Sequence, residues 1–280
     1  MSNKKNTAPK SGEKFKSKIG GQALIEGIMM LGPDKGAMAC RMPDGSIDLE
    51  TWQENNGKNA PWYKKTPLVR GCVNFVVSLI KGYKYMMKSA EKQFTEEEKE
   101  ESGSVMYQIS MYVGIVLGLV LAVGLFVFLP KFLVGLMPTV KSLRILRSIV
   151  EGLVKIAIFV LYMYLISLTK DIRRQYMYHG AEHKCINCIE HGMELNVENV
   201  QKSSRLHRRC GTSFLLIVMV VSIIFFLFIR VNSPLLRVVV RILLVPVIAG
   251  VSYEFIRLAG KSENPVVLTL SKPGLWLQKL

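Results

Sequence analysis

"VMYQISMYVGIVLGLVLAVGLFVFL", residues 105–129, continues for 25 residues without a charged side chain. About 20 apolar residues in a helix are enough to cross the hydrocarbon core of a bilayer. Backbone polar groups inside that core must be satisfied within the segment, which favours a helix over any open structure. The stretch therefore predicts a transmembrane helix, and with it a membrane protein.

Three further stretches predict spans for the same reason, although two of them contain charges. Glu151 and Lys155 lie one helical turn apart in one stretch and can pair. Arg237 and Arg241 occupy the first half of another, and we expect both to extend toward the outer membrane surface, the alternative being that one turns inward to meet an acid. The three stretches are residues 148–168, 212–229 and 233–253.

Lysine and arginine placement orients these spans. Residues 1–104 carry 17 of these cations, the 170–211 loop carries eight and the segment after Tyr253 carries four. The loop between the first two spans carries four lysines and arginines, and the loop between the last two carries at most three. Both loops lie on the other side of the membrane. Basic segments remain in the cytoplasm, so we expect both termini and the 170–211 loop to be cytoplasmic, in a multi-pass protein of the cell (inner, cytoplasmic) membrane.

The formal net charge of +16 then has a simple explanation. Most of it faces anionic lipid headgroups, so the bilayer is the expected partner, with a membrane protein as a further one. No interleaving of aromatic and basic residues argues for nucleic acid. The five cysteines all fall on the reducing cytoplasmic side or its boundary, which favours ligand roles or free thiols over disulfides.

The region before the first span predicts a small β-rich domain. Turn signals, GPDKG and PDGS, separate apolar runs and predict three strands. "GCVNFVVSLI", residues 71–80, is too short to span and predicts a helix on the membrane surface or on the sheet. The expected strands are Ala23–Leu31, Ala37–Met42 and Ser46–Thr51.

The predicted fold class is an α-helical integral membrane protein with four transmembrane helices plus a small strand-rich N-terminal cytoplasmic domain. In chain order the segments are a disordered basic arm (1–18), the β-rich domain (19–66), a surface helix with a charged linker (67–104), spans one and two (105–169), a ligand-rich cytoplasmic loop (170–211), spans three and four (212–256) and a cytoplasmic tail (257–280).

The 170–211 loop contains all four histidines and three of the five cysteines. In one interpretation, His179 and His183 share a helix face, and Glu182 between them acts as general base. This is the order H-x-x-E-H of a peptidase motif. His207, Cys210 or both would complete a metal site with an open position for catalysis.

A second interpretation uses the same loop differently. Cys185 and Cys188 form a C-x-x-C pair, and His207 and Cys210 follow as H-x-x-C. Four such ligands predict a closed structural zinc site that performs no chemistry. A third interpretation has no metal, because interfacial histidines and buried thiols are common.

Motifs spread over residues 20–278 resemble the YqhQ-like family, bacterial membrane proteins of unknown function labelled predicted metal-dependent enzymes. The motifs, in order, are GGQALIEGIMMLGP, RMPDGSI, PLVRG, YHGAEHK, VENV, HRRCGTSFL, YEFIRLAG and PGLWLQ. The family pattern has Thr where this chain has Cys185, and Pro where it has Arg208. The resemblance therefore favours the histidine-centred site, with zinc as its most natural metal.

Three further ionisable residues could support this site. Glu254 and Arg257 lie at the cytoplasmic end of the fourth span, and Glu26 interrupts an apolar strand.

Two functions stay open. One is a metal-dependent hydrolase acting at the cytoplasmic membrane face on a lipid-linked or membrane-proximal peptide substrate. The other is a non-catalytic membrane factor, an insertion or assembly helper or a regulator, with a structural zinc site.

The charge pattern yields a topology prediction. Epitope tags at residue 1, within residues 185–200 and at residue 280 are expected to be protected from membrane-impermeant reagents in intact cells, because basic segments flank them. Labelling of the 185–200 tag from outside would contradict the cytoplasmic orientation. It would also contradict the expectation that the cysteines are ligands or free thiols in a reducing compartment.

Overall fold

The computed structural model describes residues 15–54, 61–95, 104–137, 144–229 and 233–279. Most of the expected disordered arm, residues 1–14, lies outside this part. Residues 15–18 lie within it, and the Phe15 amide donates a hydrogen bond to the Glu190 carbonyl at 2.9 Å. The last residues of the basic arm are therefore attached to the rest of the molecule.

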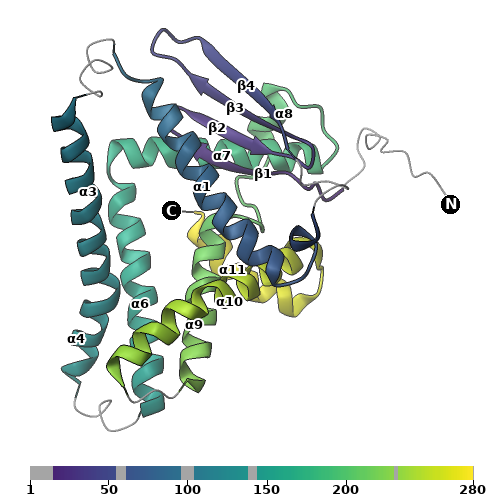
Figure 1. The fold of residues 1–280 in the computed structure, drawn as a ribbon. Helices are drawn as coiled ribbons and strands as arrows, with labels where there is room; N and C mark the ends of the chain where they lie inside the picture. The colour runs from purple at the N-terminus through teal and green to yellow at the C-terminus, as the bar shows by residue number, and fades with distance from the viewer. Residues whose placement is uncertain (1–14, 55–60, 96–103, 138–143, 230–232, 280) are drawn as a thin grey trace.

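A four-stranded antiparallel sheet forms the N-terminal layer (Figure 1). Three strands were expected, and this expectation is wrong because residues 23–31 form two strands. The chain reverses at Ile25–Glu26, so that Leu24 pairs with Gly27. The strands, each paired with the next, are β1 (Gly20–Leu24), β2 (Gly27–Leu31), β3 (Lys35–Arg41) and β4 (Ile47–Gln53).

The missed turn has a physical explanation. Two-residue hairpin turns usually contain Gly, Asn or Asp, which tolerate positive φ. Glu26 occupies this turn with φ 52°. Its carboxylate accepts hydrogen bonds from Arg174 and from the Tyr178 hydroxyl, the latter at 3.0 Å. A tertiary contact thus stabilises a turn that local sequence does not signal.

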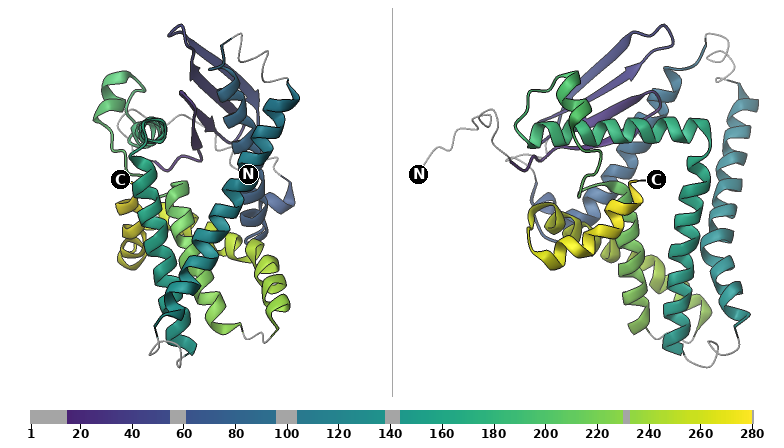
Figure 2. Two further views of the ribbon diagram at one scale, coloured as in Figure 1. Left: turned by 90° about the vertical axis from the view of Figure 1, so that its left-hand side faces the viewer. Right: turned by 180° about the vertical axis from the view of Figure 1, so that it is seen from behind.

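Helices α1 (Val69–Glu91) and α7 (Lys170–Glu190) cover opposite faces of the sheet (Figures 1 and 2). Under α1 the Trp52 ring stacks on Tyr85 with centroids 4.4 Å apart. Lys88 of α1 forms an ion pair with Glu50 of β4. The fully buried core of this face consists of Leu24, Met29, Met38 and Cys40.

Within the described residues four helices are long and apolar enough to cross a membrane, as the sequence predicts, and they extend away from the sheet (Figure 1). The predicted class, a helical membrane protein with a small N-terminal sheet, is confirmed. The spans are Val105–Gly135, Ile145–Ser167, Gly211–Phe228 and Val239–Lys261. They belong to α3 (Val105–Val123), a π-helical turn η2 (Gly124–Phe128), α4 (Leu129–Gly135), α6 (Arg144–Ser167), α9 (Gly211–Phe228) and α10 (Pro234–Lys261).

Three charged side chains inside the spans, Glu151, Lys155 and Arg241, have partners within the described segments. Lys155 donates to Glu151 at 2.8 Å, which confirms the pair expected from their spacing. The Arg241 guanidinium lies over the Phe226 ring of α9, 4.9 Å from its centroid. The side chain of Arg237 lies outside the described part of the structure.

Helix α1 connects the sheet to span α10. A Cβ atom on Gly71 would lie 2.7 Å from Gly250 Cα, so the two helices cross at nearly backbone contact. Asn74 donates to the Tyr253 hydroxyl at 2.9 Å beside this crossing. At the other end of α1, a Cβ atom on Gly82 would meet the Gln22 side chain of β1. One helix thus contacts both the bilayer-spanning part and the sheet.

The segment after the last span is helical. Helix α11 (Pro265–Leu277) packs on α9, and a Cβ atom on Gly274 would lie 2.6 Å from the Ser213 hydroxyl. The Gln278 side chain donates to the His207 carbonyl at 2.9 Å. The remaining short elements are η1 (Trp62–Lys64) and α8 (Val197–Lys202).

The crossing at Gly71 yields a stability prediction. We expect Gly71→Val to destabilise the protein by about 1–3 kcal/mol, since a side chain there forces α1 away from α10. The matched control is Gly118→Val in α3, where a Cβ atom meets nothing within 4 Å. Thermal unfolding of both variants in one detergent measures the difference. Equal destabilisation would contradict a close crossing.

Candidate metal centre

Helix α7 carries the first two members of the candidate site. His179 and His183 lie one turn apart on it, and Glu182 is next to them. Glu182 is only 3 % exposed because α7 lies close to β1: a Cβ atom on Gly21 would be 2.7 Å from Glu182 Oε1. A glycine in β1 therefore allows α7 to approach the sheet with a carboxylate between them.

Cys210 supplies the third member from a distant part of the chain. It is the N-cap residue of α9, and its Sγ accepts a hydrogen bond from the Thr212 amide at 3.4 Å. Its side chain is 2 % exposed. The first turn of a span thus brings a thiol to the histidines of α7.

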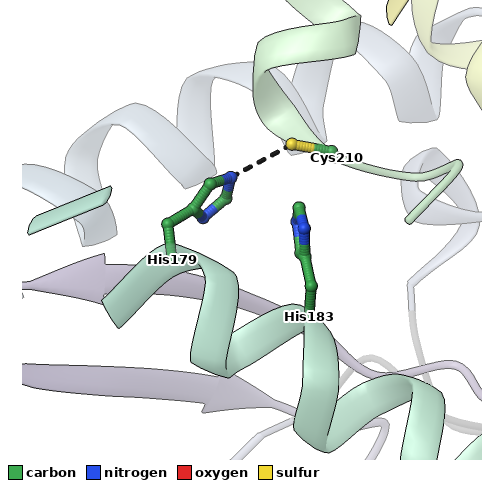
Figure 3. A group of neighbouring side chains, drawn as sticks. All are labelled: His179, His183 and Cys210. Carbon is green, nitrogen blue, oxygen red and sulfur yellow. Dashed lines mark hydrogen bonds between the residues drawn. The ribbon is translucent and has the colours of Figure 1, made fainter. Parts of the chain in front are cut away.

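The three side chains converge, as Figure 3 shows. His179 Nε2 lies 3.1 Å from Cys210 Sγ, and the opposite ring nitrogen, Nδ1, lies 2.9 Å from Glu182 Oε2. His183 Nδ1 donates to the Arg205 carbonyl at 2.7 Å. Both histidines therefore have Nδ1 bound to an acceptor, which leaves Nε2 as the available ligand atom on each ring.

This arrangement fits a metal. One ligand atom from each of His179, His183 and Cys210 lies within 4.8 Å of the others, and these three form the one such group found in the described residues. Bond lengths to tetrahedral zinc place sulfur and nitrogen ligands roughly 3.5 Å apart. A histidine held through Nδ1 by a carboxylate or carbonyl is also the usual support of a metal ligand.

The electrostatics favour a thiolate at Cys210. Burial alone would raise the pKa of this thiol, but hydrogen bonds with His179 and His183 lower it to about 5. Burial alone would lower the pKa of His179, but its contacts with Cys210 and Glu182 raise it to about 10. A thiolate can ligate a metal, and beside an imidazolium it can also be a nucleophile.

His207 lies next to this group but outside it. Its ring centroid is 5.6 Å from that of His183, and its Nε2 is 3.9 Å from Glu190 Oε2. The Ser17 hydroxyl donates to Glu190 at 2.8 Å, and Arg209 forms an ion pair with it. Burial alone would raise the pKa of Glu190, but these contacts lower it to about 2.

The cysteine-rich set does not come together. Cys188 is fully buried, and its thiol donates to the Glu194 carbonyl at 3.4 Å. Cys185 is half-buried on α7. Neither belongs to the group of converging ligand atoms within the described segments. None of the five cysteines forms a disulfide.

The three supporting candidates have other partners than the three converging side chains in the described segments. Glu254 forms an ion pair with Arg70 of α1, and Arg257 lines the pocket beside that pair. Glu26 binds α7 through Arg174 and Tyr178, before His179 in the chain.

Residues that support the cluster were not expected from the sequence, namely Gly21, Ser17, Glu190 and the Arg205 carbonyl. Only the Gly20–Gly21 pair at the start of an apolar strand carries a sequence signal, since glycine in a strand marks close approach of another segment. The other contacts join segments that are distant in the chain.

Comparison with known proteins gives a consistent family relationship. A family model described as "Protein of unknown function (DUF1385)" matches residues 66–280. The chain is similar to "Uncharacterized protein YqhQ" of Bacillus subtilis (strain 168), with 36% identity over 271 residues, 93% of this chain and 85% of that protein. No solved structure matches.

The geometry predicts which substitutions empty the site. His179→Ala, His183→Ala and Cys210→Ser should each lower bound zinc by about tenfold or more, because each removes one of the three candidate ligands. Glu182→Gln should lower bound zinc by less than about tenfold, since the amide oxygen of Gln can still accept a hydrogen bond from His179. Inductively coupled plasma mass spectrometry of dialysed protein measures the metal.

Two controls accompany these variants. His191→Ala changes a histidine of the same region whose Nδ1 faces the Asn187 carbonyl and which lies outside the group. Cys185→Ser tests the alternative set. If Cys185→Ser removes the metal and His179→Ala does not, the cysteine-rich site is correct.

Proposed function

This chain belongs to the DUF1385 family of proteins of unknown function, and we propose that it is a metal-dependent hydrolase acting at the cytoplasmic face of the cell membrane. The observation that carries the proposal is the convergence of three ligand atoms, from His179, His183 and Cys210. Three protein ligands leave one coordination position open, which is the arrangement of catalytic zinc sites.

The donor set argues for zinc. Two imidazole nitrogens and one thiolate suit zinc better than magnesium or calcium, which prefer oxygen ligands. A zinc ion would supply Lewis acidity, polarising a carbonyl and making water a nucleophile at neutral pH.

The roles of the neighbouring residues follow from their positions. Glu182 lies on the Nδ1 side of His179, opposite the nitrogen that faces Cys210, so we assign it the orientation of that ring. This role replaces the general-base role expected from the sequence. His207, beside His183 and paired with Glu190, is a further buried group that can accept a proton, and we assign it the base.

The proposed substrate follows from the location. Cys210 caps a membrane-spanning helix, so the site lies where span α9 meets the sheet layer. Basic residues dominate the segments on this side, which supports a cytoplasmic orientation. A lipid-linked or membrane-proximal peptide substrate suits a site at the end of a membrane-spanning helix.

A second function is supported by the burial of the ligands. His183 and Cys210 are each 2 % exposed, and they join α7, which lies on the sheet, to the first turn of α9. A metal held there would link the two layers without any chemistry. The protein would then be a non-catalytic factor, an assembly helper or regulator with a structural zinc.

Cobalt substitution separates the two functions without a known substrate. We expect the visible spectrum of the Co²⁺-loaded protein to shift when azide or thiocyanate is added, because an open position accepts the anion. A Co²⁺ spectrum that no added anion changes would contradict the hydrolase and support the structural role. The Cys210→Ser variant is the control, since it should lose the thiolate-to-cobalt charge-transfer band while His191→Ala keeps it.

A further inference from the structure

A second polar site lies at the end of span α10, where α1 begins. A shallow pocket of about 290 Å³, widely open to its surroundings, is lined there by Arg70, Glu254, Arg257, Leu258 and Lys261. The last four belong to one face of α10, because they recur at helical spacing, and Arg70 faces them from α1. The pocket therefore lies between two helices that cross closely nearby.

The charges in this pocket do not balance. Arg70 and Glu254 neutralise each other, with Arg70 Nε donating to Glu254 Oε1 at 2.6 Å. Arg257 and Lys261 form no ion pair within the described residues. Three cations and one carboxylate thus line the pocket, which leaves a net charge of +2 beside it.

The residues around the pocket indicate that it lies at the depth of the lipid headgroups. Lys261 is the last residue of the span, so the pocket lies where α10 leaves the apolar layer. Trp62 of η1, before α1, is 71 % exposed, and Trp276 of α11 is 56 % exposed. Tryptophan concentrates at the membrane–water boundary, where a partly apolar and partly polar ring is most stable.

Helix α11 supports the same depth. Val266 and Leu270 lie one turn apart on it and are both exposed. A helix with such an apolar face lies along a membrane surface. Leu258, in the wall of the pocket, is also exposed, so apolar and cationic groups meet at its rim.

We propose that this pocket binds the phosphate of an anionic membrane phospholipid, with Arg257 and Lys261 as its ligands. Arginine can donate two parallel hydrogen bonds to phosphate oxygens, and lysine adds a compact charge. The exposed Leu258 beside them suits an acyl chain or glycerol backbone, which a free phosphate lacks. The Arg70–Glu254 ion pair keeps α1 against α10 and so maintains the pocket. The site is independent of the metal cluster.

The test uses full-length protein purified in detergent and freed of lipid. Native mass spectrometry compares binding of dioctanoyl phosphatidylglycerol with that of dioctanoyl phosphatidylcholine. We expect wild type to prefer the anionic lipid by about tenfold, and Arg257→Gln/Lys261→Gln to reduce the preference to about twofold or less. The matched control is Lys272→Gln/Lys279→Gln, which removes the same charge at exposed positions of the same chain and should keep the preference.

Three results would overturn the proposal. One is the absence of a headgroup preference in wild type, and another is its equal loss in the control variant. The third is displacement of the lipid by an excess of inorganic phosphate, which would make a soluble phosphate the ligand. Thermal unfolding verifies that each variant is folded. If the double variant does not fold, Lys261→Gln alone, at an exposed residue, should still lower the preference measurably.

Discussion

The close approach of α7 to β1 is the constraint on which the candidate centre depends. Because Gly21 has no side chain, the Glu182 carboxylate fits between helix and strand and is almost completely buried. A buried carboxylate needs a partner, and His179 Nδ1 provides it. That contact turns His179 Nε2 toward Cys210. A larger residue at position 21 would shift α7 and with it both imidazoles.

The candidate centre also lies at the junction between the spans, which are surrounded by lipid, and the sheet layer, which is surrounded by water. Cys210 begins span α9, whereas His179 and His183 lie on a helix that covers the sheet. The loop that leads to Cys210 is held by Gln278 of the C-terminal segment and by the Glu190–Arg209 ion pair. The C-terminal segment and the end of α7 therefore help to set the position of one thiol. In such a buried setting each polar contact is strengthened by the low local dielectric.

Helix α1 makes a second connection between the same layers, on the opposite face of the sheet. Its crossing with α10 at Gly71 and Gly250 brings Arg70 to Glu254 and leaves Arg257 and Lys261 beside an open pocket. The molecule thus has a buried cluster suited to a metal and an open cationic pocket suited to a headgroup. Both lie where the spans meet the sheet layer, so a bound lipid and a bound metal would each stabilise that junction.

The sequence alone determined the membrane class, the four spans and the density of ligand-type residues between residues 179 and 210. These properties follow from composition and from spacing within one helix, which need no knowledge of distant contacts. It also predicted the Glu151–Lys155 pair, whose members lie one turn apart. Tertiary structure decided the rest. Glu26 adopts a positive φ because α7 holds it, Glu182 faces His179 because Gly21 admits it, and Cys210 joins the histidines because α9 begins beside α7. Each of these depends on the packing of segments far apart in the chain, which residue spacing does not encode.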